Sequence, residues 1–360
     1  MVSVTQFAGS AAQMKVGLVL GAGGSLGASW LMGALDALEF ETGWSASDAD
    51  RIAGTSAGAV IGALLAAGIE PASMSAYNAG KSLEAFAEVE QRVELMAQRV
   101  SGMELRLQPA LPKLGPGSWR LAVSTLVRPR RHAPSTVLAG WLPRGVISTA
   151  PISRLIETFV AGDWPDHEGY WAMAADYGSG RRVAFGRQDA PPARVADAVA
   201  ASCAIPGFYH PVTIGRRRYV DGGICSPSNL DLLCGEDVDL VLCLNPMSSV
   251  AQATGGSPGD RVAALLRAQN GRRLAHEARK LRADGKQVLI LEPSAEDVSL
   301  MGLNLMNSRR RVEVMEQARR SMALTLHDLR AEGVRLPGRA DRRRTAAPAR
   351  GHVVAKRRAA

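Results

Sequence analysis

Residues 48–69 read DADRIAGTSAGAVIGALLAAGI. The pattern predicts a short strand at about 51–54, a turn at Thr55–Ser56 and a buried helix to about Ala67, which Gly68 ends. The stretch therefore predicts a strand–turn–helix unit, in which small residues let the helix pack closely on the strand.

The N-terminal residues repeat this plan. VGLVLGAGG (16–24) is a short apolar strand that stops in glycines, and ASWLMGALDALEF (28–40) has apolar residues at helical spacing. Two such units so close together predict an α/β fold with a parallel sheet and helix-covered faces. The uncharged stretches Val16–Leu35 and Ile52–Ile69 are long enough to suggest membrane spans. Because each contains a strand–turn–helix break, we expect buried elements instead.

The 360 residues divide into three parts by composition. We expect a flexible N-terminus at 1–14, one folded domain at 15–334 and a basic, disordered tail at 335–360. Within the domain, 109–150 is rich in Pro, Gly, Arg and Trp, which predicts helical or irregular cap or lid insertions.

The charge of the chain is concentrated in the tail. Residues 335–360 contain nine Arg/Lys and one acid, so they carry +8 of the formal net charge of +9. The tail can be a solvated segment, or it can bind anionic lipid or nucleic acid. Since the rest of the chain carries only about +1, we do not expect nucleic acid to be a partner of the whole protein.

The four cysteines and the N-terminal residues indicate the cellular compartment in which we expect the protein. The cysteines form no C-x-x-C pair, and no histidine lies at zinc-ligand spacing beside them. They are expected to be buried or semi-buried free thiols in a reducing compartment. The N-terminus lacks the pattern of a signal peptide. We therefore expect a cytoplasmic protein, peripheral to the membrane at most.

The first motif with chemical meaning is Gly54-Thr55-Ser56-Ala57-Gly58. A serine on a tight turn between strand and helix exposes its hydroxyl at the edge of the sheet, near the positive end of the helix. The motif indicates a nucleophile. It also fits a turn that merely needs small residues, so it does not decide the matter alone.

The second motif is the turn Gly21-Ala22-Gly23-Gly24-Ser25-Leu26-Gly27. Its backbone N–H groups can hold the oxyanion of an acyl intermediate. Alternatively, Gly21, Gly23 and Gly27 form a loose dinucleotide-binding fingerprint. The turn by itself does not separate the two interpretations.

The third motif is Asp221-Gly222-Gly223, at the end of a predicted hairpin. It is either a simple turn or a place where a carboxylate can act as a base. A serine nucleophile needs such a base. No histidine lies in a convincing triad context; His210 is the only one close to other motif residues. Asp221 is therefore the better candidate.

The order of these motifs resembles that of the patatin-like phospholipase family of serine lipid acyl hydrolases. ASCAIPGFYHPV (201–212), which leads into Asp221, also resembles the family. The likeness covers about residues 15–245. It implies a three-layer α/β/α fold with a mostly parallel sheet.

The resemblance also implies roles for residues. Ser56 would be the nucleophile and Asp221 the base of a Ser–Asp dyad, and N–H groups at Gly23, Gly24 and Ser25 would hold the oxyanion. The glycines that carry the motifs are Gly21, Gly27, Gly54, Gly58, Gly222 and Gly223. The reaction would be hydrolysis of a fatty acyl ester of a lipid through an acyl-Ser56 intermediate, with no metal and no cofactor.

Two features leave the substrate open. The family turn commonly has Arg or Lys where this chain has Leu26, so a cation that could face a phosphate is missing. Trp119 and Trp141, in the insertion, can form an apolar entrance for acyl chains or pack inward. A nucleotide-binding protein and a non-catalytic lipid-binding protein remain the alternatives to the hydrolase.

Overall fold

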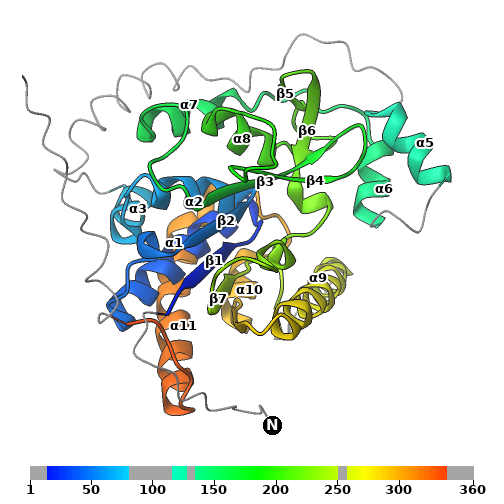
Figure 1. Ribbon diagram of the computed structural model, residues 1–360. Coiled ribbons are helices and arrows are strands. Elements are labelled where there is room, and N and C mark those ends of the chain that lie inside the picture. Colours follow the sequence, from blue (N-terminus) through cyan, green and yellow to red (C-terminus); the bar gives the residue numbers. More distant parts are fainter. Residues whose placement is uncertain (1–13, 81–115, 128–133, 250–257, 339–360) are drawn as a thin grey trace, which may run out of the picture.

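Both expected strand–turn–helix units lie at the centre of the molecule (Figure 1). The structure is a computed structural model that describes residues 14–80, 116–127, 134–249 and 258–338. The first unit is strand β1 (Val16–Leu20) and helix α1 (Gly24–Thr42). The second is β2 (Arg51–Thr55) and α2 (Ala57–Ala66). Both therefore lie where the sequence predicts them, and neither apolar stretch is a membrane span.

The remaining elements complete one sheet and its covering helices. The other strands are β3 (Tyr170–Asp176), β4 (Arg182–Phe185), β5 (Val212–Ile214), β6 (Arg217–Asp221), β7 (Leu240–Leu244) and β8 (Gln287–Leu291). The other α-helices are α3 (Pro71–Asn78), α5 (Trp119–Val127), α6 (Pro134–Trp141), α7 (Ala150–Phe159), α8 (Val195–Ser202), α9 (Pro258–Ala283), α10 (Ala295–Met301) and α11 (Arg311–Ala331).

The sheet has eight strands and is mostly parallel. Its order is β5-β6-β3-β2-β1-β7-β8, and β4 pairs with β3 beside this path. The pairs among β3, β2, β1, β7 and β8 are parallel, whereas β4, β5 and β6 join antiparallel. The chain therefore has the expected α/β fold, with its antiparallel strands at one side of the sheet.

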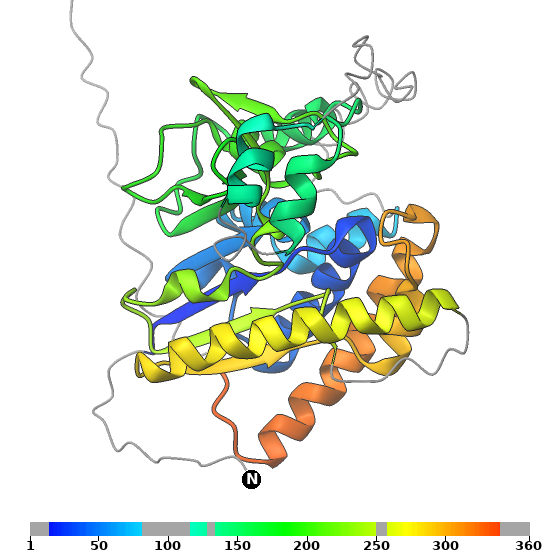
Figure 2. The same ribbon diagram turned by 90° about the vertical axis from the view of Figure 1, so that its right-hand side faces the viewer.

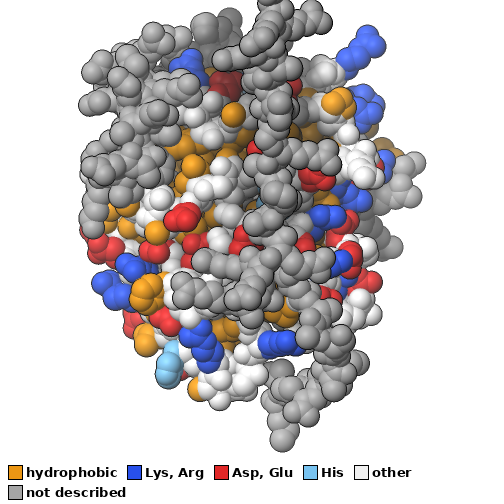
Figure 3. Space-filling model, turned by 60° about the vertical axis from the view of Figure 1, so that its left-hand side comes forward, with side chains coloured by type: hydrophobic (Ala, Val, Ile, Leu, Met, Phe, Trp, Pro, Cys, Tyr) orange, Lys and Arg blue, Asp and Glu red, His pale blue; other side chains and the backbone are white. Residues whose placement is uncertain are grey.

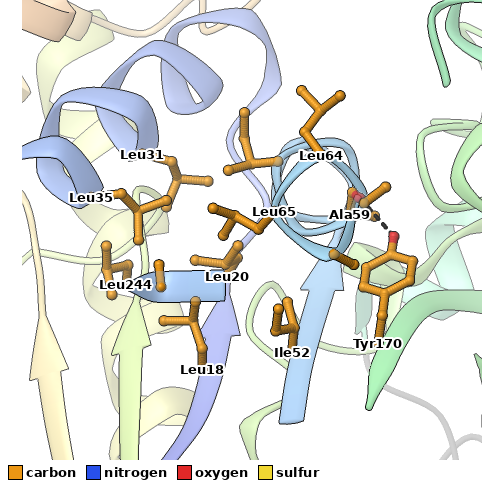
Figure 4. Packing of buried hydrophobic residues seen from close by; sticks show 14 of the residues in the cluster. Leu18, Leu20, Leu31, Leu35, Ile52, Ala59, Leu64, Leu65, Tyr170 and Leu244 are labelled. Carbon is orange, nitrogen blue, oxygen red and sulfur yellow. Dashed lines mark hydrogen bonds between the residues drawn. The ribbon is translucent and has the colours of Figure 1, made fainter. Parts of the chain in front are cut away.

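Successive residues of the central strands face two separate cores. Leu18 and Leu20 of β1 belong to the larger core with α1, α2 and α11, whereas Val19 belongs to a second core with α9. Figure 2 shows α9 across one face of the sheet, and Figure 4 shows the packing on the other. In that larger core, the hydroxyl of Tyr170 donates to the carbonyl of Ala59 at 2.6 Å. Burial on both faces explains why these strands are almost entirely apolar.

The insertion at 109–150 contains two short helices, α5 and α6, in its described part. Trp119 is 66% exposed and Trp141 is 43% exposed, so neither tryptophan packs inward. Residues 81–115 and 128–133 lie outside the described residues, as do most of the expected N-terminal segment and most of the basic tail.

Two further expectations concern thiols and membranes. Cys203, Cys225 and Cys243 are buried free thiols as expected, but the expectation is wrong for Cys234, which is exposed. No helix in the described ranges combines the length and apolarity needed to cross a bilayer. On the face drawn in Figure 3, the described basic and acidic side chains are interspersed, in keeping with the near-zero charge outside the tail.

Candidate active site

Ser56 occupies a strained turn between β2 and α2. Its backbone has φ 54° and ψ −117°, and among the described residues only Asn229 shares a positive φ without being glycine. Such a conformation costs about 1–3 kcal/mol in a residue with a Cβ, and it is typical of functional sites. Because a simple packing turn could relieve this strain with glycine, the observed conformation favours a role for the serine side chain.

Gly54 and Gly58 let the strand and helix approach each other at this turn. A Cβ on Gly54 would lie 2.3 Å from the carbonyl oxygen of Gly58, and a Cβ on Gly58 would lie 2.0 Å from that of Leu20. Both separations are far below contact distance, so any side chain would push α2 off the sheet. The spacing of these glycines is thus a packing requirement of the turn that carries Ser56.

The pairing on β3 explains why Ser56 and Asp221 meet. Thr55, the last residue of β2, pairs with Met173, and Asp221, the last residue of β6, pairs with the next residue, Ala174. Consecutive Cα atoms are 3.8 Å apart. Ser56 and Asp221, which lie far apart in sequence, therefore flank β3 at neighbouring positions, one on each side of that strand.

Asp221 is a buried carboxylate with few partners. It is 5% exposed, and its Oδ1 accepts a hydrogen bond from the N–H of Gly223 at 2.7 Å. Burial raises the pKa of Asp221 to about 6, while the N–H of Gly223 and the hydroxyl of Ser56 act in the opposite direction. A carboxylate with a raised pKa is a better proton acceptor at neutral pH than an ordinary one.

The glycine turn presents free backbone donors at the start of α1. Gly23 is the N-cap residue, and the first helical hydrogen bond runs from the N–H of Gly27 to the carbonyl of Gly23. Within the described ranges, no acceptor takes the N–H of Gly23, Gly24 or Ser25. Gly24 has φ 60°, which favours glycine. Unsatisfied N–H groups at a helix N-terminus suit an anion.

Leu26 lies outside this donor group. Its side chain is 1% exposed and belongs to the larger core, and its N–H donates to the carbonyl of Leu305 at 2.9 Å. The side chain at this position therefore points into the protein, and the turn supplies no cation to the cavity.

A cavity of about 650 Å³ brings the motifs together. Ser56, Asp221, Gly23, Gly24 and Gly223 line it. Of the remaining predicted residues, Ser25, Gly21, Gly27, Gly54, Gly58 and Gly222 do not line it. Most of the other lining side chains are apolar, from α6, the segment after α8, and the loops near Met247 and Leu305. The sequence prediction thus located the centre of the cavity but little of its wall.

No histidine supports a triad in the described residues. His210 lies after α8, and its Nδ1 is 2.9 Å from the carbonyl oxygen of Pro211. Neither it nor another described histidine lines the cavity. Cys203 is a thiol close to Ser56 and Asp221; burial, followed by the charge of Asp221, raises its pKa, so it remains a neutral thiol.

Ser202 is a residue of the site that motif analysis missed. Its hydroxyl accepts a hydrogen bond from the N–H of Ser56 at 2.9 Å and donates to the carbonyl of Met173 at 2.6 Å. Ser202 is fully buried at the end of α8. It ties the strained turn to β3, at the position where β3 aligns Ser56 with Asp221.

For the ester hydrolysis that the resemblance implies, we predict that Ser202→Ala lowers kcat about 10- to 100-fold and leaves KM nearly unchanged, because the turn loses its tether and a buried N–H loses its partner. Steady-state kinetics on a soluble ester measures both constants. Ser202→Thr, which keeps the hydroxyl, should recover part of kcat. A variant that melts earlier but keeps its full kcat would mean that Ser202 serves folding alone.

These features define an α/β protein whose cavity joins a serine, a carboxylate and free backbone donors. The profile of the family described as Patatin-like phospholipase matches residues 18–233. The chain belongs to this family, and its membership supports a lipid hydrolase activity.

Two solved structures match the chain at low sequence identity and low TM-score. VipD from Legionella pneumophila is 12% identical, with a TM-score of 0.40, and the match covers 89% of this chain and 68% of that one. ExoU, solved as the heterodimeric ExoU–SpcU complex of the Pseudomonas aeruginosa type III secretion system, is 18% identical, with a TM-score of 0.32. That match covers 88% of this chain but only 52% of ExoU. No curated protein matches the sequence.

Proposed function

We propose that the protein is a serine acyl hydrolase that cleaves fatty acyl ester bonds of lipids. The observation that carries the proposal is the strained Ser56 beside the buried Asp221, in a cavity that the donor turn also lines. Family membership supports the substrate class, and the apolar wall suits an acyl chain.

In the proposed reaction the Asp221 carboxylate takes the proton of the Ser56 hydroxyl while Oγ attacks the ester carbonyl carbon. The carbonyl oxygen becomes an oxyanion, which N–H groups of Gly23, Gly24 and Ser25 stabilise. Collapse breaks the bond to the alkoxy oxygen, and Asp221 returns the proton to the leaving alcohol. Water then attacks the acyl-Ser56 ester with Asp221 as base, which releases the fatty acid and restores Ser56.

The test is covalent labelling of the wild-type protein with a fluorophosphonate, followed by peptide mass spectrometry. We expect one adduct, on Ser56, and hydrolysis of p-nitrophenyl esters that stops as the adduct forms. An adduct on another residue would overturn the assignment of the nucleophile. No adduct, together with a thermal shift on adding NAD(P), would favour the nucleotide-binding alternative.

Peripheral contact with a lipid surface is part of the proposal. Trp119, Val123 and Val127 are exposed and four residues apart on α5, so they share one helical face. Leu138 of α6 is also exposed and lines the cavity. An exposed apolar stripe with tryptophan, on a helix that packs against the cavity-lining helix α6, suits insertion into a lipid interface.

A further inference from the structure

The cavity has one polar wall, which comes from α9. Gln269, Asn270 and Arg273 line the cavity and are spaced so that they share one face of this helix. Among the described lining residues, Arg273 and Asp221 are the two charged side chains. A cavity with apolar walls, a nucleophile and a single cation is suited to a ligand with an apolar chain and an anionic end.

Arg273 is held in place by a buried carboxylate. Its Nε lies 3.3 Å from Oε1 of Glu277, which is 3% exposed. Oε2 of Glu277 accepts from the hydroxyl of Ser228 at 2.8 Å and from the N–H of Leu230 at 3.1 Å. Two hydrogen bonds to Oε2 thus fix Glu277, and Glu277 in turn fixes one edge of the Arg273 guanidinium.

The other edge of the guanidinium is free for a ligand. Within the described residues, the two terminal nitrogens of Arg273 make no hydrogen bond, and its side chain is 40% exposed. The planar fork of arginine binds phosphate oxygens in a bidentate manner. The Nδ2 group of Asn270 donates to the carbonyl of Met247 at 3.2 Å, and this hydrogen bond fixes the orientation of the Asn270 amide beside Arg273.

We propose that Arg273, with Gln269 and Asn270 beside it, forms a subsite for the phosphate of a lipid headgroup. The subsite rests on the proposed hydrolase function and deepens it, since it selects acyl esters whose leaving alcohol carries a phosphate. It supplies from α9 the cation that the buried Leu26 does not supply from the glycine turn.

The experiment compares two oleoyl esters that differ only in the phosphate, lysophosphatidic acid and monooleoylglycerol, both in neutral detergent micelles. Arg273→Gln should lower the ratio of kcat/KM for the phosphate-bearing ester over the neutral ester about 10- to 100-fold. Arg273→Lys should lower it less. Arg272→Gln is the matched control because Arg272 is exposed, adjacent and does not line the cavity. An equal effect of both Gln variants would overturn the subsite and point to attraction of the whole surface.

Binding gives a readout that does not need turnover. In a Ser56→Ala background, lysophosphatidic acid should bind more tightly than monooleoylglycerol, and Arg273→Gln should remove the difference. If the difference persists in Arg273→Gln, the subsite is wrong even if the hydrolase is right. If fluorophosphonate leaves Ser56 unlabelled while the binding difference follows Arg273, the hydrolase is wrong and the subsite stands. Glycerol 3-phosphate that binds as tightly as the lysolipid would identify a free phosphate ester as the ligand and overturn a lipid headgroup.

Discussion

Replacing Ser56 with alanine should lower kcat for ester hydrolysis by at least about 10⁴-fold, because removal of the proposed nucleophile leaves only binding and oxyanion stabilisation. The same variant should form no fluorophosphonate adduct. Alanine keeps the Cβ at φ 54°, so the turn keeps its conformation and the fold should survive. Kinetics on p-nitrophenyl esters, with circular dichroism as the check on folding, measures the effect.

The strain at Ser56 gives this prediction a second variant. Ser56→Gly should be as inactive as Ser56→Ala but more stable by about 1–3 kcal/mol, because glycine adopts a positive φ without penalty. Ser308→Ala is the control, since Ser308 is exposed and does not line the cavity. Hydrolysis by Ser56→Ala within tenfold of the wild type would refute the role of Ser56.

The central strands and the motif turns could be predicted because their determinants are local. The apolar strands, the small residues of α2 and the glycines around Ser56 are each readable within about ten residues. The position of Asp221 close to Ser56 could not be predicted from local sequence, because it depends on the pairing of β2 and β6 with Met173 and Ala174 of β3. In the sequence, only the order of the three motifs indicated that Asp221 is the partner of Ser56.

The wall of the cavity could not be predicted in this way. Ser202 contacts Ser56 across 146 residues of sequence, and its role depends on where α8 ends. Arg273 reaches the cavity from a long, basic helix, and the sequence does not distinguish it from its exposed neighbour Arg272. Leu26 illustrates the opposite case: the sequence showed a missing cation, but only the structure shows that this side chain points into the core.

Replacing Asp221 with asparagine should lower kcat/KM about 10³-fold or more, because the amide cannot accept the Ser56 proton. In the wild type, kcat/KM should rise with pH through an apparent pKa of about 6, as Asp221 loses its proton and becomes a base. Measurement of kcat/KM from pH 4.5 to 8.5 tests this. The residual activity of Asp221→Asn should lack that step. A wild-type profile that is flat between pH 5 and 7 would contradict the assignment of the base.

Asp221→Asn should also make the protein more stable, and only at higher pH. The folded-state pKa of about 6 exceeds the ordinary value of 3.8, so the folded protein holds this proton more tightly than the unfolded chain. The wild type therefore loses stability as pH rises from about 4 to about 6. One pKa unit corresponds to about 1.4 kcal/mol, so the total loss is roughly 3 kcal/mol. Asparagine does not ionise, and the variant escapes this cost.

Urea unfolding should show a stability difference, variant minus wild type, that grows by up to about 3 kcal/mol between pH 4 and pH 7.5. Asp189→Asn, at an exposed aspartate, should show little of this growth. A difference that stays constant with pH would mean that the carboxylate of Asp221 is not held at a raised pKa in the folded protein, and the case for Asp221 as the base would then lose its electrostatic support.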